Sequence, residues 1–241
     1  MKQVDPGTTT TTVDLASEMA QIDWRASPLG TLAERHHPHQ LHVPHQPALT
    51  VFYLRFPPPG TSLLAQEFVL APEEQARLST MADARRIEFT LLRGLVRLLL
   101  GRWLKIAPEQ VPIGTNANGK PVLLREQGPW FNLSHTQGHG LCAIDLRGPV
   151  GVDVERAERQ LRTPMEAIAK RILSGAALTE IESADPTDRD AVFLRQWVRN
   201  EAASKAHGTG LRRGGTVDPR LDVIDLNDIS DCVAAVARSR A

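Results

Sequence analysis

The sequence is short of several features that mark particular protein classes. Its 241 residues include two cysteines, Cys142 and Cys232, and a single tyrosine. Two cysteines cannot build a disulfide scaffold and do not indicate an oxidising compartment. The 28 basic and 28 acidic residues leave no net charge, which excludes a globally basic nucleic-acid binder and an acidic disordered chain.

Long apolar runs are also missing. The most hydrophobic segment, residues 91–104, is interrupted by Arg93, Arg97 and Arg102, so it falls short of the ~18 uninterrupted apolar residues of a membrane span. The N-terminal residues lack the apolar core of a signal peptide. We therefore expect a cytoplasmic protein that binds neither membrane nor nucleic acid.

The first 48 residues differ in composition from the rest. Thr8 to Thr12 is a homopolymer, and five of the eight histidines lie between residues 36 and 47 among three prolines. A histidine tract can bind a metal, but no cysteine or carboxylate joins this one to fix a geometry. We therefore predict that residues 1–48 form a poorly ordered, proline-broken extension.

From residue 49 the pattern is that of packed protein. β-Branched and aromatic residues predict a strand at 49–56, and helical spacing of apolar residues predicts two helices between 72 and 99, with a break near Asp83. The further expected elements are a strand pair at 131–133 and 141–146, a strand at 150–154, helices at 164–173 and 188–207, and strands at 223–226 and 232–236. Since strands and helices do not alternate strictly, we predict an α+β fold.

Two pairs of charged residues are candidates for chemistry. Asp153 and Glu155 lie two apart on a predicted strand, so both carboxylates face the same way, and without thiolate or imidazole partners they suit a hard cation such as Mg²⁺. Glu201 and Lys205 lie one helical turn apart on the 188–207 helix. Taken alone, a solvated strand face and a surface ion pair explain these residues better.

Asn132, Ser134 and His135 form a polar cluster after a short apolar strand. Adjacent Ser134 and His135 would point apart in an extended segment, and no nucleophile elbow surrounds the serine, so we interpret them as phosphate contacts before hydrolytic groups. A capped turn is an equal alternative. Lys120, one of five lysines against 23 arginines, is either a phosphate ligand in a rigid turn or an ordinary hairpin tip.

Five short segments follow one another in an order that indicates a protein family. They are Gly119–Pro121, Phe131–Thr136, Gly151–Glu155, Trp197–Lys205 and Gly208–Leu211. Together they resemble the 4′-phosphopantetheinyl transferase family, in its larger surfactin-synthetase-activating type, over about residues 49–236. Upstream, residues 85–93 resemble the basic helix of that family.

The resemblance implies a fold and a reaction. The fold is two similar subdomains related by pseudo-two-fold symmetry, each a small antiparallel sheet with packed helices, here residues 49–148 and a shortened 149–241. The reaction is that of holo-[acyl-carrier-protein] synthase type enzymes. A serine hydroxyl of an apo acyl or peptidyl carrier protein attacks the β-phosphate of coenzyme A, the phosphopantetheine arm is transferred and 3′,5′-ADP leaves. Such enzymes prime natural-product or fatty-acid synthesis, and a two-halved chain is expected to be a monomer.

The resemblance also implies roles for individual residues. Asp153, Glu155 and Glu201 would hold Mg²⁺ on the diphosphate, with Glu201 alternatively deprotonating the attacking serine. Lys205 would neutralise charge on the diphosphate and the leaving group. The 3′-phosphate and adenine end would be bound by Arg85, Arg86, Arg93, Lys120, Asn132, Ser134 and His135.

One position departs from the family pattern. Asn200 stands where the family usually has a lysine before the metal-binding glutamate. Losing a charge-assisted hydrogen bond costs ~1.5–3 kcal/mol of binding, unless Arg199 takes over the contact. The alternative is therefore a weakened or inactive homologue that binds coenzyme A or a carrier protein. Because all three metal residues are present, we favour an active enzyme.

Overall fold

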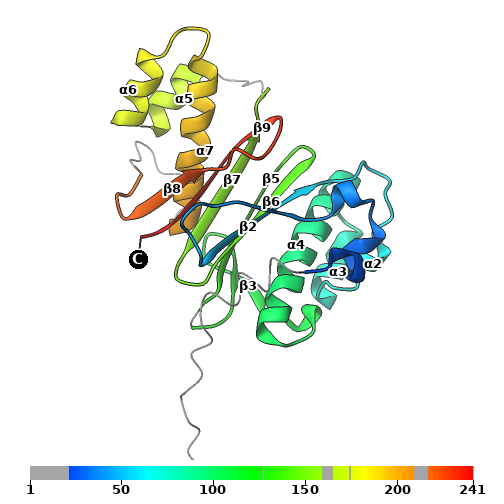
Figure 1. Cartoon of the computed structure of the whole chain (residues 1–241). Helices are drawn as coiled ribbons and strands as arrows, with labels where there is room; N and C mark the ends of the chain where they lie inside the picture. The colour runs from blue at the N-terminus through cyan, green and yellow to red at the C-terminus, as the bar shows by residue number, and fades with distance from the viewer. Residues whose placement is uncertain (1–21, 127, 159–164, 174, 209–216, 241) are drawn as a thin grey trace, which may run out of the picture.

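Two antiparallel sheets lie side by side at the centre of the molecule (Figure 1). The structure is a computed structural model that describes residues 22–126, 128–158, 165–173, 175–208 and 217–240. The first sheet has the order β1-β2-β6-β5 and the second the order β7-β9-β8, while β3 and β4 form a separate hairpin. The strands are β1 (His39–Leu41), β2 (Leu49–Arg55), β3 (Ile113–Thr115), β4 (Pro121–Leu123), β5 (Trp130–Thr136), β6 (His139–Asp145), β7 (Val150–Arg156), β8 (Leu221–Asp225) and β9 (Cys232–Ser239).

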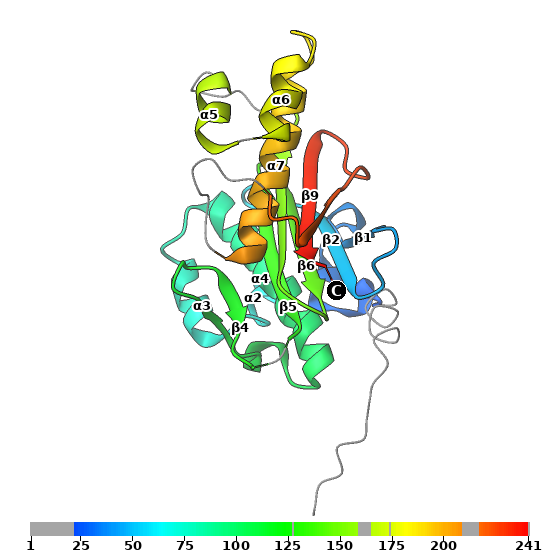
Figure 2. The same ribbon diagram turned by 90° about the vertical axis from the view of Figure 1, so that its left-hand side faces the viewer.

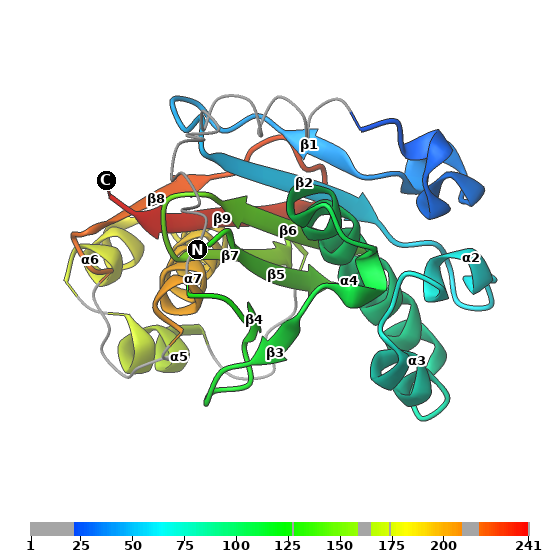
Figure 3. The same cartoon turned by 90° about the horizontal axis from the view of Figure 1, so that it is seen from below.

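Each central sheet is covered by one long helix. The helix α4 packs against the first sheet and α7 against the second, and Figure 3 shows the β3–β4 hairpin between these two helices. The short helices α5 and α6 pack beside α7 (Figure 2). The helices are α2 (Leu64–Glu67), α3 (Pro72–Leu78), α4 (Asp83–Leu104), α5 (Met165–Ile172), α6 (Ala176–Ser183) and α7 (Arg189–His207), with 3₁₀ turns η1 (Trp24–Ala26), η2 (Pro28–Thr31), η3 (Glu34–His36) and η4 (Pro108–Gln110). In the part of the chain that is described, no helix is long and apolar enough to cross a membrane.

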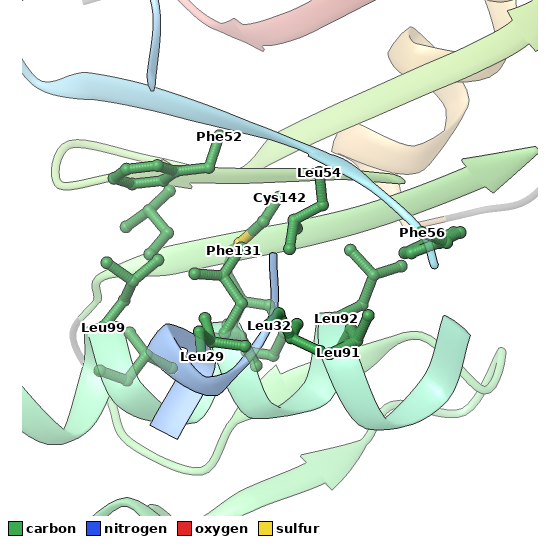
Figure 4. Close-up of a cluster of buried hydrophobic side chains, with 14 of the residues drawn as sticks. Leu29, Leu32, Phe52, Leu54, Phe56, Leu91, Leu92, Leu99, Phe131 and Cys142 are labelled. Atoms are coloured by element: carbon green, nitrogen blue, oxygen red, sulfur yellow. The ribbon is translucent and has the colours of Figure 1, made fainter. Parts of the chain in front are cut away.

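The largest core forms between α4 and the first sheet. The buried leucines of α4, among them Leu91 and Leu99, meet Phe52 and Leu54 of β2 (Figure 4). Their helical spacing is the signal that predicted this helix, and the predicted break near Asp83 is confirmed because α3 ends at Leu78 and α4 begins at Asp83. Mixed strands and helices with small antiparallel sheets confirm the α+β class.

One arginine of α4, Arg97, is buried in the protein interior. Arg97 is 1% exposed, and its Nε donates to Oε2 of Glu74 on α3 at 2.6 Å. Its Nη1 donates to the carbonyl oxygens of Pro108 and Val111, both at 2.9 Å. A charge this deep is stable only when paired and fully hydrogen-bonded, so Arg97 fixes α3 and η4 onto α4.

The prediction of a poorly ordered extension is wrong for residues 22–48, while residues 1–21 lie outside the described chain. β1 pairs with β2, and Leu29 and Leu32 are buried in the α4 core (Figure 4). Two of the clustered histidines are also buried. A ring nitrogen of His36 bonds the carbonyl of Arg55 at 2.8 Å, and one of His37 bonds the carbonyl of Leu32 at 3.0 Å. These rings satisfy main-chain groups, which composition alone did not reveal.

Candidate active site

The two sheets meet where β5 runs beside β7. Asn132 Oδ1 accepts from the main-chain N–H of Val152 at 2.9 Å, and Ser134 Oγ donates to Asp153 Oδ1 at 2.9 Å. Asn132 contacts Val152 and Ser134 contacts Asp153, so the residue numbers of the contacting pairs increase together along the two strands. β5 and β7 therefore run in the same direction. The two sheets are therefore joined at this seam by side-chain hydrogen bonds, without a main-chain ladder between β5 and β7. Asn132, predicted as a coenzyme contact, is 4% exposed and acts in this join.

A close helix–strand contact delivers a lysine to the same seam. A Cβ atom at Gly151 would collide with the main chain of α7 at Ala202 and Ala206, so glycine is required for this approach. From the last turn of α7, Lys205 Nζ donates to Asp153 Oδ1 at 2.7 Å. It also donates to Ser134 Oγ at 3.0 Å. The predicted residues Ser134, Asp153 and Lys205 are thus brought into one contact group.

Only one of the two carboxylate oxygens of Asp153 takes part in this contact group. The residue is 5% exposed, and Oδ1 accepts from both Ser134 and Lys205. Its other oxygen, Oδ2, is buried and has no hydrogen-bond partner among the described residues. A buried carboxylate oxygen without a donor is costly, and a hard cation is the kind of group that would relieve that cost.

The other predicted metal residues lie on the strand of Asp153 and on the helix that packs against that strand. Glu155 follows on the same face of β7, and Thr136 Oγ1 lies 3.5 Å from its Oε2. Glu201 lies one turn before Lys205 on α7. Across the described ranges, no three histidine, cysteine, aspartate or glutamate side chains come close enough to hold a metal ion by themselves. A cation here would need ligand oxygens from a bound molecule.

The β3–β4 hairpin is fastened to the end of α7. Lys120 Nζ donates to the carbonyls of Val150 and Lys205, at 3.0 and 2.5 Å. Asn118 Nδ2 donates to the carbonyl of Gly208 at 2.6 Å. Burial, with a smaller effect of Lys205, lowers the pKa of Lys120 to about 8. The structure therefore gives Lys120 a main-chain clamping role that its sequence context did not predict.

A cationic cleft of about 440 Å³ opens beside the seam. Its walls come from α3, α4, β5 and the β3–β4 hairpin, and its described lining residues are Arg77, Met81, Arg85, Glu88, Phe89, Leu92, Arg93, Thr115, Gly119, Pro121, Leu133 and His135. Of the three arginines predicted to bind the coenzyme, Arg85 and Arg93 line the cleft. Arg86 is absent from that lining and pairs instead with Asp83 at 2.7 Å.

Two guanidinium groups of the cleft lie near the same aromatic ring. The Cζ atoms of Arg77 and Arg93 lie 5.7 and 5.6 Å from the centre of the Phe89 ring. Arg93 Nη1 is buried and lacks a hydrogen-bond partner in the described structure, and burial lowers the pKa of Arg93. Arg93 also forms an ion pair with Glu74, whose Oε1 lies 3.2 Å from its Nε. A guanidinium N–H group that lacks an acceptor in the described structure, on a cleft wall, favours an anionic ligand. Sequence analysis missed Arg77, although its position in the last turn of α3 placed it near the basic helix.

The mouth of the cleft holds a triangle of charged and polar groups. Arg85 Nη1 lies 2.5 Å from His135 Nε2 and 3.4 Å from Glu88 Oε2. His135 Nδ1 lies 3.7 Å from the same Glu88 oxygen. Burial lowers the pKa of His135, against the opposing effect of Glu88, so the imidazole is mainly neutral at pH 7.

The position that departs from the family pattern is buried. Asn200 is 5% exposed, and its Nδ2 has no hydrogen-bond partner among the residues described. Arg199 Nη1 donates to Asp225 Oδ1 at 2.7 Å, and Arg195 binds the other oxygen of that carboxylate. Because Arg199 is committed to β8, the structure does not support its taking over the lysine contact.

Sequence comparison relates the chain to a known family of proteins. The model of the 4′-phosphopantetheinyl transferase superfamily matches residues 149–239. The 4′-phosphopantetheinyl transferase HetI of Nostoc is 30% identical over 217 residues, which cover 75% of this chain and 91% of the relative. The chain belongs to the 4′-phosphopantetheinyl transferase family.

Other relatives of the transferase cover less of each chain. The 4′-phosphopantetheinyl transferase psf-1 of Bacillus pumilus is 33% identical over 57% of this chain and 56% of the relative. The transferase Sfp of Bacillus subtilis is 26% identical over 59% of this chain and 62% of the relative. The HetI match reaches beyond the second half of the chain, so the family assignment does not rest on residues 149–239 alone.

Proposed function

We propose that this transferase moves the 4′-phosphopantetheine arm of coenzyme A to a serine of an apo acyl or peptidyl carrier protein and releases 3′,5′-ADP. The observation that carries the proposal is the buried Asp153 carboxylate beside a cationic cleft. One of its oxygens is paired to Lys205, and the other has no hydrogen-bond partner within the described ranges. A diphosphate needs positioning and charge neutralisation more than covalent chemistry from the enzyme. This site supplies both cationic and cation-binding groups.

Different residues would bind the diphosphate and the nucleotide end of coenzyme A. Asp153, Glu155 and Glu201 would hold Mg²⁺, and the unpartnered oxygen of Asp153 fits that role. When bound, Mg²⁺ would neutralise charge on the diphosphate. The Lys205 ammonium neutralises charge on the same group, while Ser134 fixes the lysine and the aspartate relative to each other.

The cleft is the proposed site for the nucleotide end of coenzyme A. The guanidinium groups of Arg77, Arg85 and Arg93 line it, and the unpartnered Nη1 of Arg93 is suited to a phosphate oxygen. Lys120 acts indirectly, because its ammonium holds the β3–β4 hairpin, which forms one wall of the cleft, against the end of α7.

The remaining parts of the proposal concern organisation and partners. We propose that residues 49–148 and 149–241 are related subdomains, since each sets one long helix against antiparallel strands. We also propose a monomer that accepts an acidic carrier protein, because the seam between the halves is completed within one chain and a cationic surface favours an acidic partner.

A carrier-loading assay tests the function. Purified protein, coenzyme A and Mg²⁺ should add the phosphopantetheine mass to fatty-acid, polyketide or peptide apo carriers, as measured by mass spectrometry beside a competent control enzyme. Asp153→Asn keeps the shape of the side chain but removes its charge, so transfer should fall at least 100-fold, as it should for Glu201→Ala. Glu109→Gln, an exposed change on η4, should transfer at the wild-type rate.

The second candidate function is binding without turnover. The buried Nδ2 of Asn200, which has no hydrogen-bond partner among the described residues, favours it, since this position lacks the family's charged side chain. Calorimetry of coenzyme A with and without Mg²⁺ separates the two. Tight Mg²⁺-dependent binding with no mass gain on any carrier class would replace the enzyme with a binding protein. No binding and no transfer would refute both functions.

A further inference from the structure

A single acidic side chain stands among the described residues that line the cationic cleft. Glu88 on α4 shares the lining with Arg77, Arg85, Arg93 and His135. Its side chain is 20% exposed, so the carboxylate is largely removed from water but can be reached from the cleft. Its negative charge opposes the binding of an anion, which the arginines of the cleft would favour.

Hydrogen-bond geometry shows what Glu88 does in the free protein. Arg85 is always a donor, so its 2.5 Å contact requires His135 Nε2 to be an acceptor. The proton of the neutral imidazole then lies on Nδ1, which faces Glu88 Oε2 at 3.7 Å. Arg85 also approaches that oxygen at 3.4 Å. The carboxylate therefore balances the charge of Arg85 and faces the Nδ1–H group of His135 at the mouth of the cleft.

A ligand phosphate would seek the same two groups. Arg85 and His135 are both accessible to an entering anion, with side chains 52% and 37% exposed. A phosphate bound there must displace Glu88 from them or lie close to a like charge. Both alternatives weaken binding of the phosphate. Neither affects a ligand that lacks it.

We propose that Glu88 is a specificity-determining residue that limits how strongly the cleft prefers coenzyme A over 3′-dephospho-coenzyme A. The inference rests on the proposed function, which places the 3′-phosphate end of coenzyme A in this cleft. Glu88 competes with that phosphate for Arg85 and His135. The affinity of the protein for the phosphorylated ligand is accordingly lower than the arginines alone would give.

Calorimetric titration of the full chain with coenzyme A and with 3′-dephospho-coenzyme A, at fixed pH and low salt with Mg²⁺, tests this. Glu88→Gln keeps the shape and a carbonyl acceptor but removes the charge. It should bind coenzyme A about three- to tenfold more tightly and leave the affinity for the dephosphorylated ligand unchanged. Glu88→Ala should shift the affinities in the same direction, which keeps the test open if the glutamine variant does not fold. Asp83→Asn removes the same charge from the same helix but lies at the Arg86 pair, outside the cleft lining, and should alter neither affinity.

The outcomes separate this inference from the proposed function. If wild-type protein binds coenzyme A but Glu88→Gln binds it equally or less tightly, or changes both affinities alike, the role of Glu88 is refuted and the proposed function stands. If wild-type protein binds neither ligand, the proposed function fails and the inference fails with it.

Discussion

Replacement of Asn132 by leucine tests how the two halves are joined. Asn132 Oδ1 accepts the main-chain N–H of Val152 at 2.9 Å, and both residues are buried. β7 pairs with β9 on its other side, so this N–H points toward β5 and depends on the side chain. Leucine has a similar size, which limits the added cost of a cavity, but it offers no acceptor.

The expected loss follows from the orphaned donor. Leaving a buried N–H unsatisfied costs about 1–3 kcal/mol. For a protein of this size each kcal/mol lowers the Tm by about 2–4 °C, so a loss near the middle of that range predicts a Tm about 4–8 °C lower. Thermal unfolding followed by circular dichroism measures the shift. The carrier-loading rate per folded molecule should fall as well, because Ser134 and Asp153 rely on the same seam.

Thr136→Val provides the matched control at the same seam. Its hydroxyl lies 3.5 Å from Glu155, a contact too long to contribute much, so its Tm should stay within about 2 °C of wild type. An unchanged Tm for Asn132→Leu would refute the reasoning that this amide closes the two halves. An equal loss in both variants would show that any polar change at the seam is sufficient.

Two further predictions concern buried charges elsewhere. Glu74→Gln leaves Arg97 buried without its carboxylate partner, and the free energy of unfolding in urea should fall by about 3–5 kcal/mol; a wild-type midpoint would contradict this. The pKa of Lys120 falls from 10.5 to about 8 on folding, so the unfolded chain binds the extra proton between these values and stability should rise with pH across that window. Urea unfolding at pH 7.5 and 9.5 should show this rise in wild type relative to Lys120→Met, and parallel pH profiles would refute it.

Local sequence patterns predicted the helices and helix ends that depend on interactions between residues close in the chain. The 3.6-residue spacing of leucines gave α4, because burying one face of a helix requires that spacing. Gly208 takes a left-handed conformation at the end of α7, as its position after the last helical residues predicted. The contact of Asp153 with Lys205 joins residues 52 apart in the chain. The family resemblance assigned both residues to the diphosphate, but neither it nor any local rule predicted this contact.

Errors arose where a side chain acts across elements. The histidine-rich composition of residues 36–47 predicted disorder, but the rings of His36 and His37 bond main-chain carbonyls that only the folded chain brings near. Arg77 was missed because its place on the cleft depends on the packing of α3 against α4. That packing is set by the buried contact between Glu74 and Arg97, which hydrophobic periodicity does not encode.

The location of the chemistry follows from how the halves meet. Within a ladder, main-chain groups satisfy one another and side chains are free to be apolar. Between β5 and β7 the side chains of Asn132 and Ser134 make the join, so polar groups must be buried there. Burial then gives Asp153 an oxygen with no donor in the described structure, a cost that proteins tend to retain at functional sites. The proposed site for a cation and a diphosphate therefore uses some of the same groups that hold the two sheets together.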